Sequence, residues 1–341
     1  MPYSSSTPQS PTAVDRYQTH RFCIAPMIDW TDKHCRYFHR KLTQSARLYT
    51  EMITTGAIIH GDRERHLRKH DSENVIALQL GGSDPYALNQ SIQIANAFGY
   101  DEYNLNVGCP SDRVQSGRFG ACLMREANLV ADCVKAMQDA AGHQEVTVKC
   151  RTGIDNDDSF EFLVDFIGTV NDSACETFII HARKAWLSGL SPKENREIPP
   201  LHYERVHKIK QLFPTLNIII NGGLLDLGQA GEQLEHCDGV MFGRAAYNNP
   251  WLLTEVDQKL FDGKPNTNSR HAIIESMLPY IEQELSYGAR LHHITRHMLG
   301  LFNGMKGAKQ YRRYLSEHAN QKEAGIETLI TASQFVISDQ G

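Results

Sequence analysis

The chain has 341 residues, of which 41% are hydrophobic and 22% are charged, and this balance excludes an intrinsically disordered protein. Its net charge of −5 excludes a surface that is basic throughout, and no stretch approaches the roughly 20 apolar residues of a membrane span. A chain of this length fits two domains, or one large barrel with an appendage.

The N-terminal residues 1–20 are polar and rich in Pro and Ser, without the apolar core of a secretion signal. We therefore expect a flexible tail and a cytoplasmic protein. The eight cysteines include no Cys-x-x-Cys pair, which gives no support to a zinc ribbon or an iron–sulfur site. Reduced thiols and no bound metal are the expectation.

Short runs rich in β-branched residues recur along the first 245 residues and alternate with helix-length segments such as Pro85–Phe98, Asn128–Ala141 and Ser159–Asn171. The predicted strands are Phe22–Ala25, Arg47–Tyr49, Val75–Leu80, Glu102–Asn106, Val146–Lys149, Thr177–His181, Asn217–Asn221 and Gly239–Phe242. Such alternation predicts a parallel sheet with right-handed crossovers. Eight units in about 240 residues favour a closed (β/α)8 TIM barrel, and the absence of a Gly-x-Gly-x-x-Gly motif after the first strand disfavours a Rossmann domain.

Strand signals stop after this region, and Asp262–Pro265 has the composition of a linker. Four helices are predicted beyond it, at His271–Ser286, Leu291–Phe302, Ala308–His318 and Ala324–Val336. The expected organisation is an N-terminal tail over 1–20, a barrel over 21–261 and a small all-α helical bundle over 266–341.

Functional residues of a TIM barrel lie where its strands run into loops at the C-terminal face. The residues at those positions are Ala25, Pro26, Met27, Gln79, Asn106, Cys109, Lys149, His181, Asn221, Gly222, Gly223, Gly243 and Arg244. We expect them to form one site.

Two of these loops favour phosphate binding. Asn221-Gly222-Gly223 follows the seventh strand and Gly243-Arg244 follows the eighth, the usual phosphate-binding position in a barrel. Gly-Gly alone could merely turn the chain. The occurrence of glycine in both loops, together with a basic side chain, favours an anion site.

Lys149 ends an apolar run, so its ammonium group needs an anionic partner such as a phosphate, an enolate or a reduced flavin, unless it is a surface lysine. His181 and Gln79 could hydrogen-bond a heterocycle, although a strand-end histidine is as often structural. Cys109 lies between Gly108 and Pro110, which constrain its direction. Its thiol could serve as a general acid or a nucleophile, or could be a small buried apolar group.

The C-terminal region has a one-sided charge pattern. From Leu285 to Ser316 there is no Asp or Glu, whereas Arg and Lys recur together with Tyr. A solvated helix face normally mixes both signs, so this pattern favours a polyanionic partner, namely a nucleic acid. The basic runs Arg63–Lys69 and Arg183–Arg196 could extend the same surface.

Taken in order, these motifs resemble those of the tRNA-dihydrouridine synthases. The motifs that carry the resemblance are Ala25–Met27, Asn104–Pro110 with Gly120-Ala121, Val148–Gly153, Ile180–Arg183, Asn221–Gly223 and Gly243-Arg244. The segments His181–Arg196 and Gly300–Gly304 are similar to those of the A subfamily of bacterial enzymes.

The resemblance implies an FMN-dependent barrel enzyme that reduces uridines 20 and 20a of the tRNA D-loop, with NADPH as reductant. It implies that Ala25, Pro26, Met27 and Gln79 line the isoalloxazine ring, and that Lys149 and His181 contact the flavin. Asn221, Gly222, Gly223, Gly243 and Arg244 would hold its phosphate and ribityl chain. Asn106 would contact the target uridine, Cys109 would donate a proton, and Lys193, Arg196, Lys309 and Arg312 would contact tRNA. We expect a monomer.

Three other functions remain open at this point. A flavin barrel acting on free pyrimidines would use the same strand-end chemistry but would not need the basic tail. A tRNA-binding protein without turnover would not need Cys109, and a phosphate-binding isomerase would lack flavin.

Overall fold

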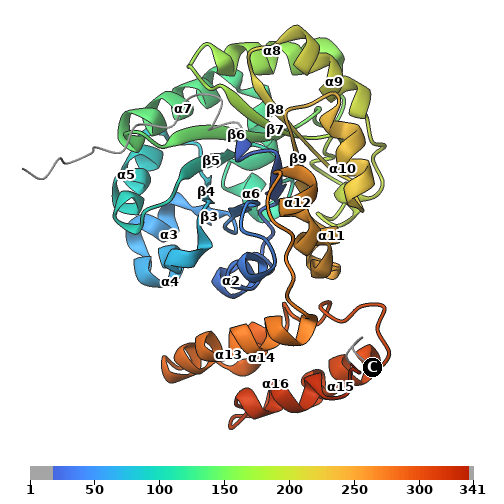
Figure 1. The fold of residues 1–341 in the computed structure, drawn as a ribbon. Helices are drawn as coiled ribbons and strands as arrows, with labels where there is room; N and C mark the ends of the chain where they lie inside the picture. Colours follow the sequence, from blue (N-terminus) through green and yellow to red (C-terminus); the bar gives the residue numbers. More distant parts are fainter. Residues whose placement is uncertain (1–17, 338–341) are drawn as a thin grey trace, which may run out of the picture.

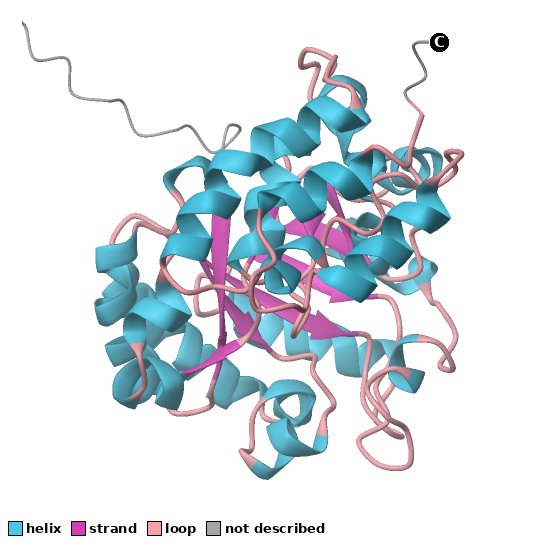
Figure 2. Ribbon diagram, turned by 90° about the horizontal axis from the view of Figure 1, so that it is seen from below, coloured by secondary structure: helices cyan, strands magenta, loops and turns pink. Residues whose placement is uncertain are grey.

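The computed structural model describes residues 18–337, so most of the predicted N-terminal tail lies outside the described residues. Eight parallel strands form a closed ring. They are β1 (Phe22–Ile24), β2 (Arg47–Tyr49), β4 (Ile76–Gly81), β5 (Glu102–Asn106), β6 (Glu145–Arg151), β7 (Thr177–His181), β8 (Asn217–Asn221) and β9 (Gly239–Phe242). Since β1 pairs with both β2 and β9, and β2 with β4, the ring of eight strands closes on itself and the predicted TIM barrel is confirmed. Figure 2 shows the strands with helices around them.

The predicted strand boundaries differ from the observed ones by at most two residues. A short additional strand that the sequence did not predict, β3 (Ile53–Thr54), pairs with the end of β4. β6 continues to Arg151, so Lys149 lies within the strand and not at its end.

Helices surround the ring of strands (Figure 1). Around the barrel they are α2 (Lys33–Leu42), α3 (Thr55–His60), α4 (Arg63–Leu67), α5 (Pro85–Ala95), α6 (Asp112–Ser116), α7 (Ala127–Ala141), α8 (Phe160–Asn171), α9 (Tyr203–Leu212), α10 (Leu227–Leu234), α11 (Arg244–Asn248) and α12 (Val256–Leu260). Short 3-10 turns join several of them: η1 (Asp71–Glu73), η2 (Asn96–Phe98), η3 (Gly120–Arg125), η4 (Glu194–Arg196) and η5 (Pro250–Glu255).

α8 shows how the sequence specifies these outer helices. Ser159 precedes it, and the Ser159 hydroxyl accepts a 3.0 Å hydrogen bond from the backbone N–H of Phe162, which caps the first turn. Leu163, Phe166 and Ile167 recur at helical spacing and are fully or almost fully buried. The apolar face of the helix therefore packs inward.

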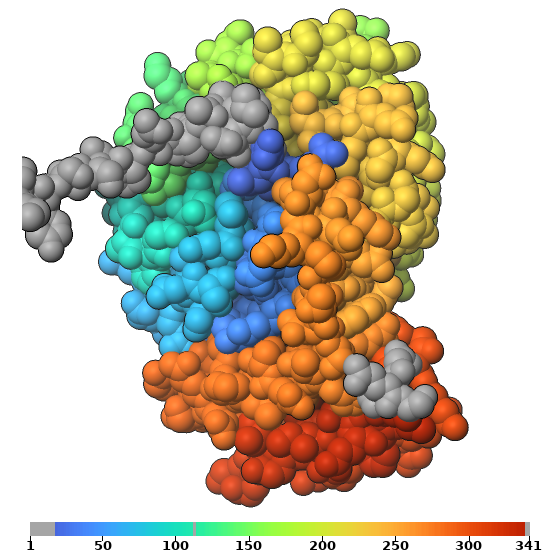
Figure 3. Space-filling view, viewed as in Figure 1, coloured from blue at the N-terminus to red at the C-terminus, as the bar shows by residue number. Residues whose placement is uncertain are grey.

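Four further helices form the C-terminal bundle: α13 (Arg270–Ser286), α14 (Leu291–Thr295), α15 (Ala308–His318) and α16 (Ile326–Ser333). In Figures 1 and 3 the segment coloured orange, with α13 and α14, lies between the barrel and the red helices α15 and α16. The helix predicted over Leu291–Phe302 ends at Thr295, and the chain then runs in turns to Gly307. Within these turns a Cβ on Gly300 would lie 2.4 Å from the carbonyl oxygen of Asn248, so the chain packs closely against the barrel at this point. The helix predicted over Ala324–Val336 is also shorter at both ends.

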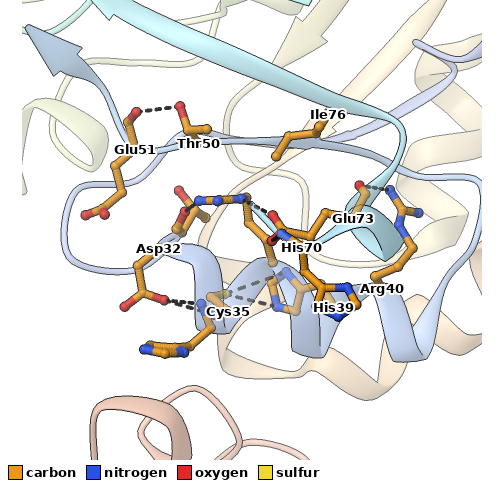
Figure 4. A network of polar contacts seen from close by, with 12 residues as sticks. Asp32, Cys35, His39, Arg40, Thr50, Glu51, His70, Glu73 and Ile76 are labelled. Atoms are coloured by element: carbon orange, nitrogen blue, oxygen red, sulfur yellow. Dashed lines mark hydrogen bonds and ion pairs between the residues drawn. The ribbon is translucent and has the colours of Figure 1, made fainter. Parts of the chain in front are cut away.

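Charged and polar contacts join the bundle to the start of α2. The carboxylate of Asp32 accepts hydrogen bonds from the backbone N–H groups of His34 and Cys35, which cap α2 (Figure 4). The same carboxylate contacts Arg296 at 2.7 Å and His297 at 3.0 Å in the bundle. Because Asp32 follows β1, these contacts place the bundle beside the C-terminal face of the barrel. No helix within residues 18–337 is long and apolar enough to span a membrane.

Candidate active site

A cavity of about 910 Å³ lies at the carboxyl ends of the barrel strands. The residues predicted at strand ends all line it: Ala25, Pro26, Met27, Gln79, Asn106, Cys109, Lys149, His181, Asn221, Gly222, Gly223, Gly243 and Arg244. Arg196 also reaches it, whereas Lys193, Lys309 and Arg312 are not among its lining residues. The barrel thus brings together side chains from all around the ring.

Lys149 places a half-buried ammonium group in this cavity. Its Nζ donates a 3.0 Å hydrogen bond to Oδ1 of Asn221, whose Nδ2 donates in turn to the carbonyl of Met241 at 2.8 Å. Burial, followed by the charge of Arg151, lowers the pKa of Lys149 to about 8. A negatively charged ligand would stabilise the protonated form of this side chain.

His181 is buried beside Lys149, and its Nδ1 has no hydrogen-bond partner among the described residues. Burial, with the nearby charges of Arg151 and Lys149, holds the pKa of His181 well below its usual value. The ring is therefore neutral at physiological pH and has one nitrogen that can accept and one that can donate a hydrogen bond. His181 lines the cavity, and a ring with one unpartnered nitrogen fits a polar ligand there.

The loop after β8 requires glycine at two positions. Gly222 and Gly223 have φ angles of +116° and +72°, which other residues rarely adopt. A Cβ on Gly222 would also lie 3.1 Å from Nε2 of His181, and the Tyr203 hydroxyl holds the Gly222 carbonyl at 2.6 Å. The loop can therefore bring its backbone close to a ligand.

Arg244 follows β9 at the cavity wall, and its guanidinium donates to the carboxylate of Glu197 and, at 3.4 Å, to the carbonyl of Arg196. The side chain predicted to bind phosphate is thus ion-paired with the loop after β7. The sequence motifs did not predict this contact, because the two residues lie far apart in the sequence.

The loop that carries Cys109 is held from two sides. Oδ1 of Asn106 accepts hydrogen bonds from the backbone N–H groups of Gly108 at 3.1 Å and Cys109 at 3.0 Å. Nε of Arg151 donates to the carbonyl of Gly108 at 2.8 Å. The half-buried Cys109 thiol, 3.5 Å from Oγ of Ser111, therefore has a fixed position in the cavity wall.

The four residues predicted to contact tRNA lie at two places. Lys193 and Arg196 are exposed in and beside η4, and Arg196 reaches the cavity. Lys309 is exposed on α15, while Arg312 is half-buried and donates a 2.9 Å hydrogen bond to Oδ1 of Asn303. The structure does not bring these two pairs into contact with each other.

The sequence prediction missed Arg151, a buried residue that lies two positions after Lys149 on β6. Besides Gly108, it holds the carbonyls of Lys184 and Asn195, at 3.1 and 3.0 Å. Because side chains two residues apart on a strand share a face, the position of Lys149 could have predicted that Arg151 faces the same side. The prediction also missed the buried polar residues Glu102, Asn104 and Thr147, although Glu102 and Asn104 share the same spacing with Asn106.

The cavity is suited to an anionic ligand. Four basic side chains line it (Lys149, Arg151, Arg196 and Arg244), and no acidic residue of the described chain does. Its volume is in the range of small-molecule and cofactor sites. Across residues 18–337 there is no group of three His, Cys, Asp or Glu side chains arranged to hold a metal ion.

Comparison with solved structures supports the fold. The chain is similar to 2-naphthoyl-CoA reductase in complex with 2-naphthoyl-CoA, with a TM-score of 0.56 and 9% identity. The similarity covers 70% of this chain and only 50% of that one.

Comparison with protein sequences is more specific. The sequence model of the family described as "Dihydrouridine synthase (Dus)" matches residues 23–337. The tRNA-dihydrouridine(20/20a) synthase of Yersinia pestis is 58% identical to this chain, over 96% of this chain and 94% of that protein. The enzyme of the same name from Escherichia coli K12 is 58% identical, over 97% of this chain and 96% of that protein. The one from Shewanella oneidensis is 59% identical, over 93% of this chain and 94% of that protein. The chain therefore belongs to the dihydrouridine synthase family.

Proposed function

We propose that this chain reduces uridines 20 and 20a in the D-loop of tRNA to dihydrouridine, with bound FMN as cofactor and NADPH as reductant. The observation that carries the proposal is a positioned thiol, Cys109, in a cavity that is lined by basic side chains and not by acidic ones. The names of the relatives that match over nearly the whole chain support the same substrate and positions.

The residues that would hold FMN fall into two groups. Ala25, Pro26, Met27 and Gln79 offer the surface for the isoalloxazine ring, with Lys149 and His181 as polar contacts. Asn221, Gly222, Gly223, Gly243 and Arg244 would hold the phosphate and ribityl chain. The half-buried ammonium of Lys149 and the His181 ring, which has a nitrogen without a partner among the described residues, fit this anionic, hydrogen-bonding group.

Reduced FMN, when bound, supplies the hydride that is added to C6 of the uracil ring. The Cys109 thiol donates a proton to C5, so the C5–C6 double bond becomes a single bond. The resulting thiolate takes up a proton from water before the next turnover. Asn106, beside Cys109, contacts the uracil ring and orients it.

The target base has to leave its stack to reach the cavity. We assign the barrel, 21–261, to catalysis and the helical region, 266–341, to tRNA binding. Arg196 at the cavity and Lys193 nearby in the same loop, with Lys309 and Arg312 in the bundle, would contact phosphates, so affinity would fall with salt concentration. The enzyme would act as a cytoplasmic monomer.

A spectrum and a mass measurement test this proposal. The purified protein, reconstituted with FMN, should show flavin absorption. Incubated with NADPH and tRNA that lacks dihydrouridine, it should add the mass of one hydride and one proton to each of uridines 20 and 20a. A protein that remains colourless, or a yellow protein active only on free pyrimidines, would refute the proposal. A parallel reaction with NADH tests the choice of reductant.

A further inference from the structure

The interior of the barrel is polar along one strand. Glu102, Asn104 and Asn106 alternate along β5 and are buried, with exposed fractions of 0%, 0% and 8%. The interior of a TIM barrel is ordinarily filled by branched apolar side chains, because unpaired polar groups are costly there. Burying these polar side chains costs free energy, which their hydrogen bonds must offset.

The hydrogen bonds form one continuous chain from the barrel interior to the cavity. The Thr147 hydroxyl donates to Oε1 of Glu102 at 2.5 Å, and Nδ2 of Asn104 donates to the Thr147 hydroxyl at 2.7 Å. Nε2 of Gln79 donates to Oδ1 of Asn104 at 2.7 Å, and Nδ2 of Asn106 donates to Oε1 of Gln79 at 2.8 Å. We call Glu102, Thr147, Asn104, Gln79 and Asn106 the polar chain.

Both ends of the polar chain impose the same donor-to-acceptor direction on the hydrogen bonds between them. At one end the ionised carboxylate of Glu102 can only accept hydrogen bonds. At the other end the backbone N–H groups of Gly108 and Cys109 can only donate, and Oδ1 of Asn106 accepts from both. Every amide between these ends must therefore direct its NH2 group toward Glu102 and its oxygen toward the Cys109 loop.

The surroundings of Glu102 keep it ionised. Burial alone would raise its pKa, but Arg47 and His20, each 2.8 Å from Oε2, hold the pKa well below its usual value. The Tyr49 hydroxyl donates to Oε1 at 2.8 Å from outside the polar chain. Glu102 therefore only accepts hydrogen bonds from the polar chain over the whole physiological pH range.

We propose that Glu102 and Thr147 are positioning residues that fix the amide orientation of Gln79 and Asn106 at the cavity. Oδ1 of Asn106 already accepts two hydrogen bonds, so this side chain can offer a ligand only the second N–H of Nδ2. If the proposed function holds, on which this step rests, that N–H faces a carbonyl oxygen of the uracil, where negative charge develops as hydride reaches C6.

Substitutions at Thr147 test the proposal, with Tyr49→Phe as a matched control. Thr147→Val removes the hydroxyl that links Glu102 to Asn104 while keeping the side-chain shape. Tyr49→Phe removes a hydrogen bond to the same oxygen of Glu102 but leaves the polar chain intact. Thr147→Ser restores the hydroxyl and should rescue the properties that Thr147→Val loses.

The first readout does not depend on activity. In the full-length protein labelled with 15N, the side-chain amide resonances of Gln79 and Asn106 should shift in Thr147→Val and stay in place in Tyr49→Phe and Thr147→Ser. Unchanged resonances in Thr147→Val would overturn the proposal.

The second readout is dihydrouridine formation. Loss of one oriented hydrogen bond should lower kcat by about tenfold in Thr147→Val, with little change in KM for tRNA. An equal loss in Tyr49→Phe would show general destabilisation and overturn the positioning role. If the resonances shift as expected but the wild-type protein forms no dihydrouridine, the proposed function fails and the orientation of the amides stands.

Discussion

Nδ2 of Asn303 donates a 2.6 Å hydrogen bond to the backbone carbonyl of Asn248, which lies at the rim of the cavity. Oδ1 of the same Asn303 accepts from Arg312, one of the residues assigned to tRNA binding. The bundle is therefore attached at the place where a bound tRNA would have to present its base. Disturbing this attachment should affect the substrate more than the cofactor.

Gly300→Ala should disturb it. A Cβ at this position would lie 2.4 Å from the carbonyl oxygen of Asn248 and 2.8 Å from Cδ of Pro250, so the bundle must shift. We expect a loss of about 1–3 kcal/mol in the free energy of unfolding and a raised KM for tRNA. Thermal unfolding and steady-state kinetics measure the two effects. Gly231→Ala on α10 is the control, because a Cβ there meets nothing within 4 Å. Equal behaviour of the two variants would contradict the tight contact.

Cys109→Ala should retain flavin and tRNA binding but lose most uridine reduction, because the proton donor to C5 is gone. General acids typically contribute about 10²–10⁴-fold to a rate, and a loss in this range is expected in single-turnover assays. Cys122→Ala, at a half-buried thiol that is not among the residues lining the cavity, should keep its activity. Normal turnover by Cys109→Ala would rule out the assigned proton donor.

Lys149→Met should change how stability depends on pH in the FMN-free protein. Because the pKa of Lys149 falls from 10.5 to about 8 on folding, the unfolded state binds more protons between these values. The wild-type protein therefore gains stability as pH rises from about 8 to 10.5, and the full penalty of the partly buried charge, about 3 kcal/mol, applies below pH 8. Urea unfolding at several pH values should show this slope in the wild type and a flatter one in the variant. Parallel curves would contradict the assigned pKa.

Asp32→Asn should keep the cap of α2 but weaken the attachment of the bundle. Burial would raise the pKa of Asp32, but His297 holds it below its usual value, so the stabilisation is present above about pH 4 and is lost as pH falls. We expect a cost of about 1 kcal/mol at pH 7, because Arg296 is partly exposed. Denaturant unfolding at pH 7 and pH 3 measures it. Asp226→Asn, at the cap of α10, provides the control, and a similar cost there would argue against a role of the bundle contact.

Lys309→Ala should weaken tRNA binding and make it less dependent on salt. Removing one phosphate contact lowers the slope of log K against log salt concentration by about 1. Titrations at several salt concentrations determine the slope, and the flavin spectrum should not change. Arg312→Glu should weaken binding further, because it also reverses the charge. The control is Lys259→Ala in the barrel helix α12, where Lys259 pairs with Glu255. If Lys259→Ala and Lys309→Ala gave the same slope, the proposed contact between the bundle and tRNA would be contradicted.

The barrel was predictable because its strands are short apolar runs between helical segments, as in Phe178–Ile180 of β7 and Ile218–Ile220 of β8. Their C-terminal ends necessarily meet on one face, so many of the residues that line the cavity could be predicted from the sequence. Helix α15 was predicted with the observed boundaries for a similar reason: its pattern is local.

What escaped prediction depends on contacts between distant residues. The pairing of Arg244 with Glu197 joins two loops, and Gly300, beyond the end of α14, packs closely against Asn248. The orientation of Gln79 and Asn106 depends on a carboxylate from within the barrel and on backbone N–H groups of the Cys109 loop. No local periodicity contains this information.

Closure of the ring by pairing between β1 and β9 has a consequence for synthesis. Phe22 is aligned with Val240, so the first strand of the barrel pairs with the last one. Until the last strand has been synthesised, the sheet has two unpaired edges. The cavity takes Met27 from one side of this seam and Gly243 from the other. On the ribosome, the cavity is therefore completed only after β9 (Gly239–Phe242) has emerged, and binding of the proposed flavin would mark the end of barrel folding.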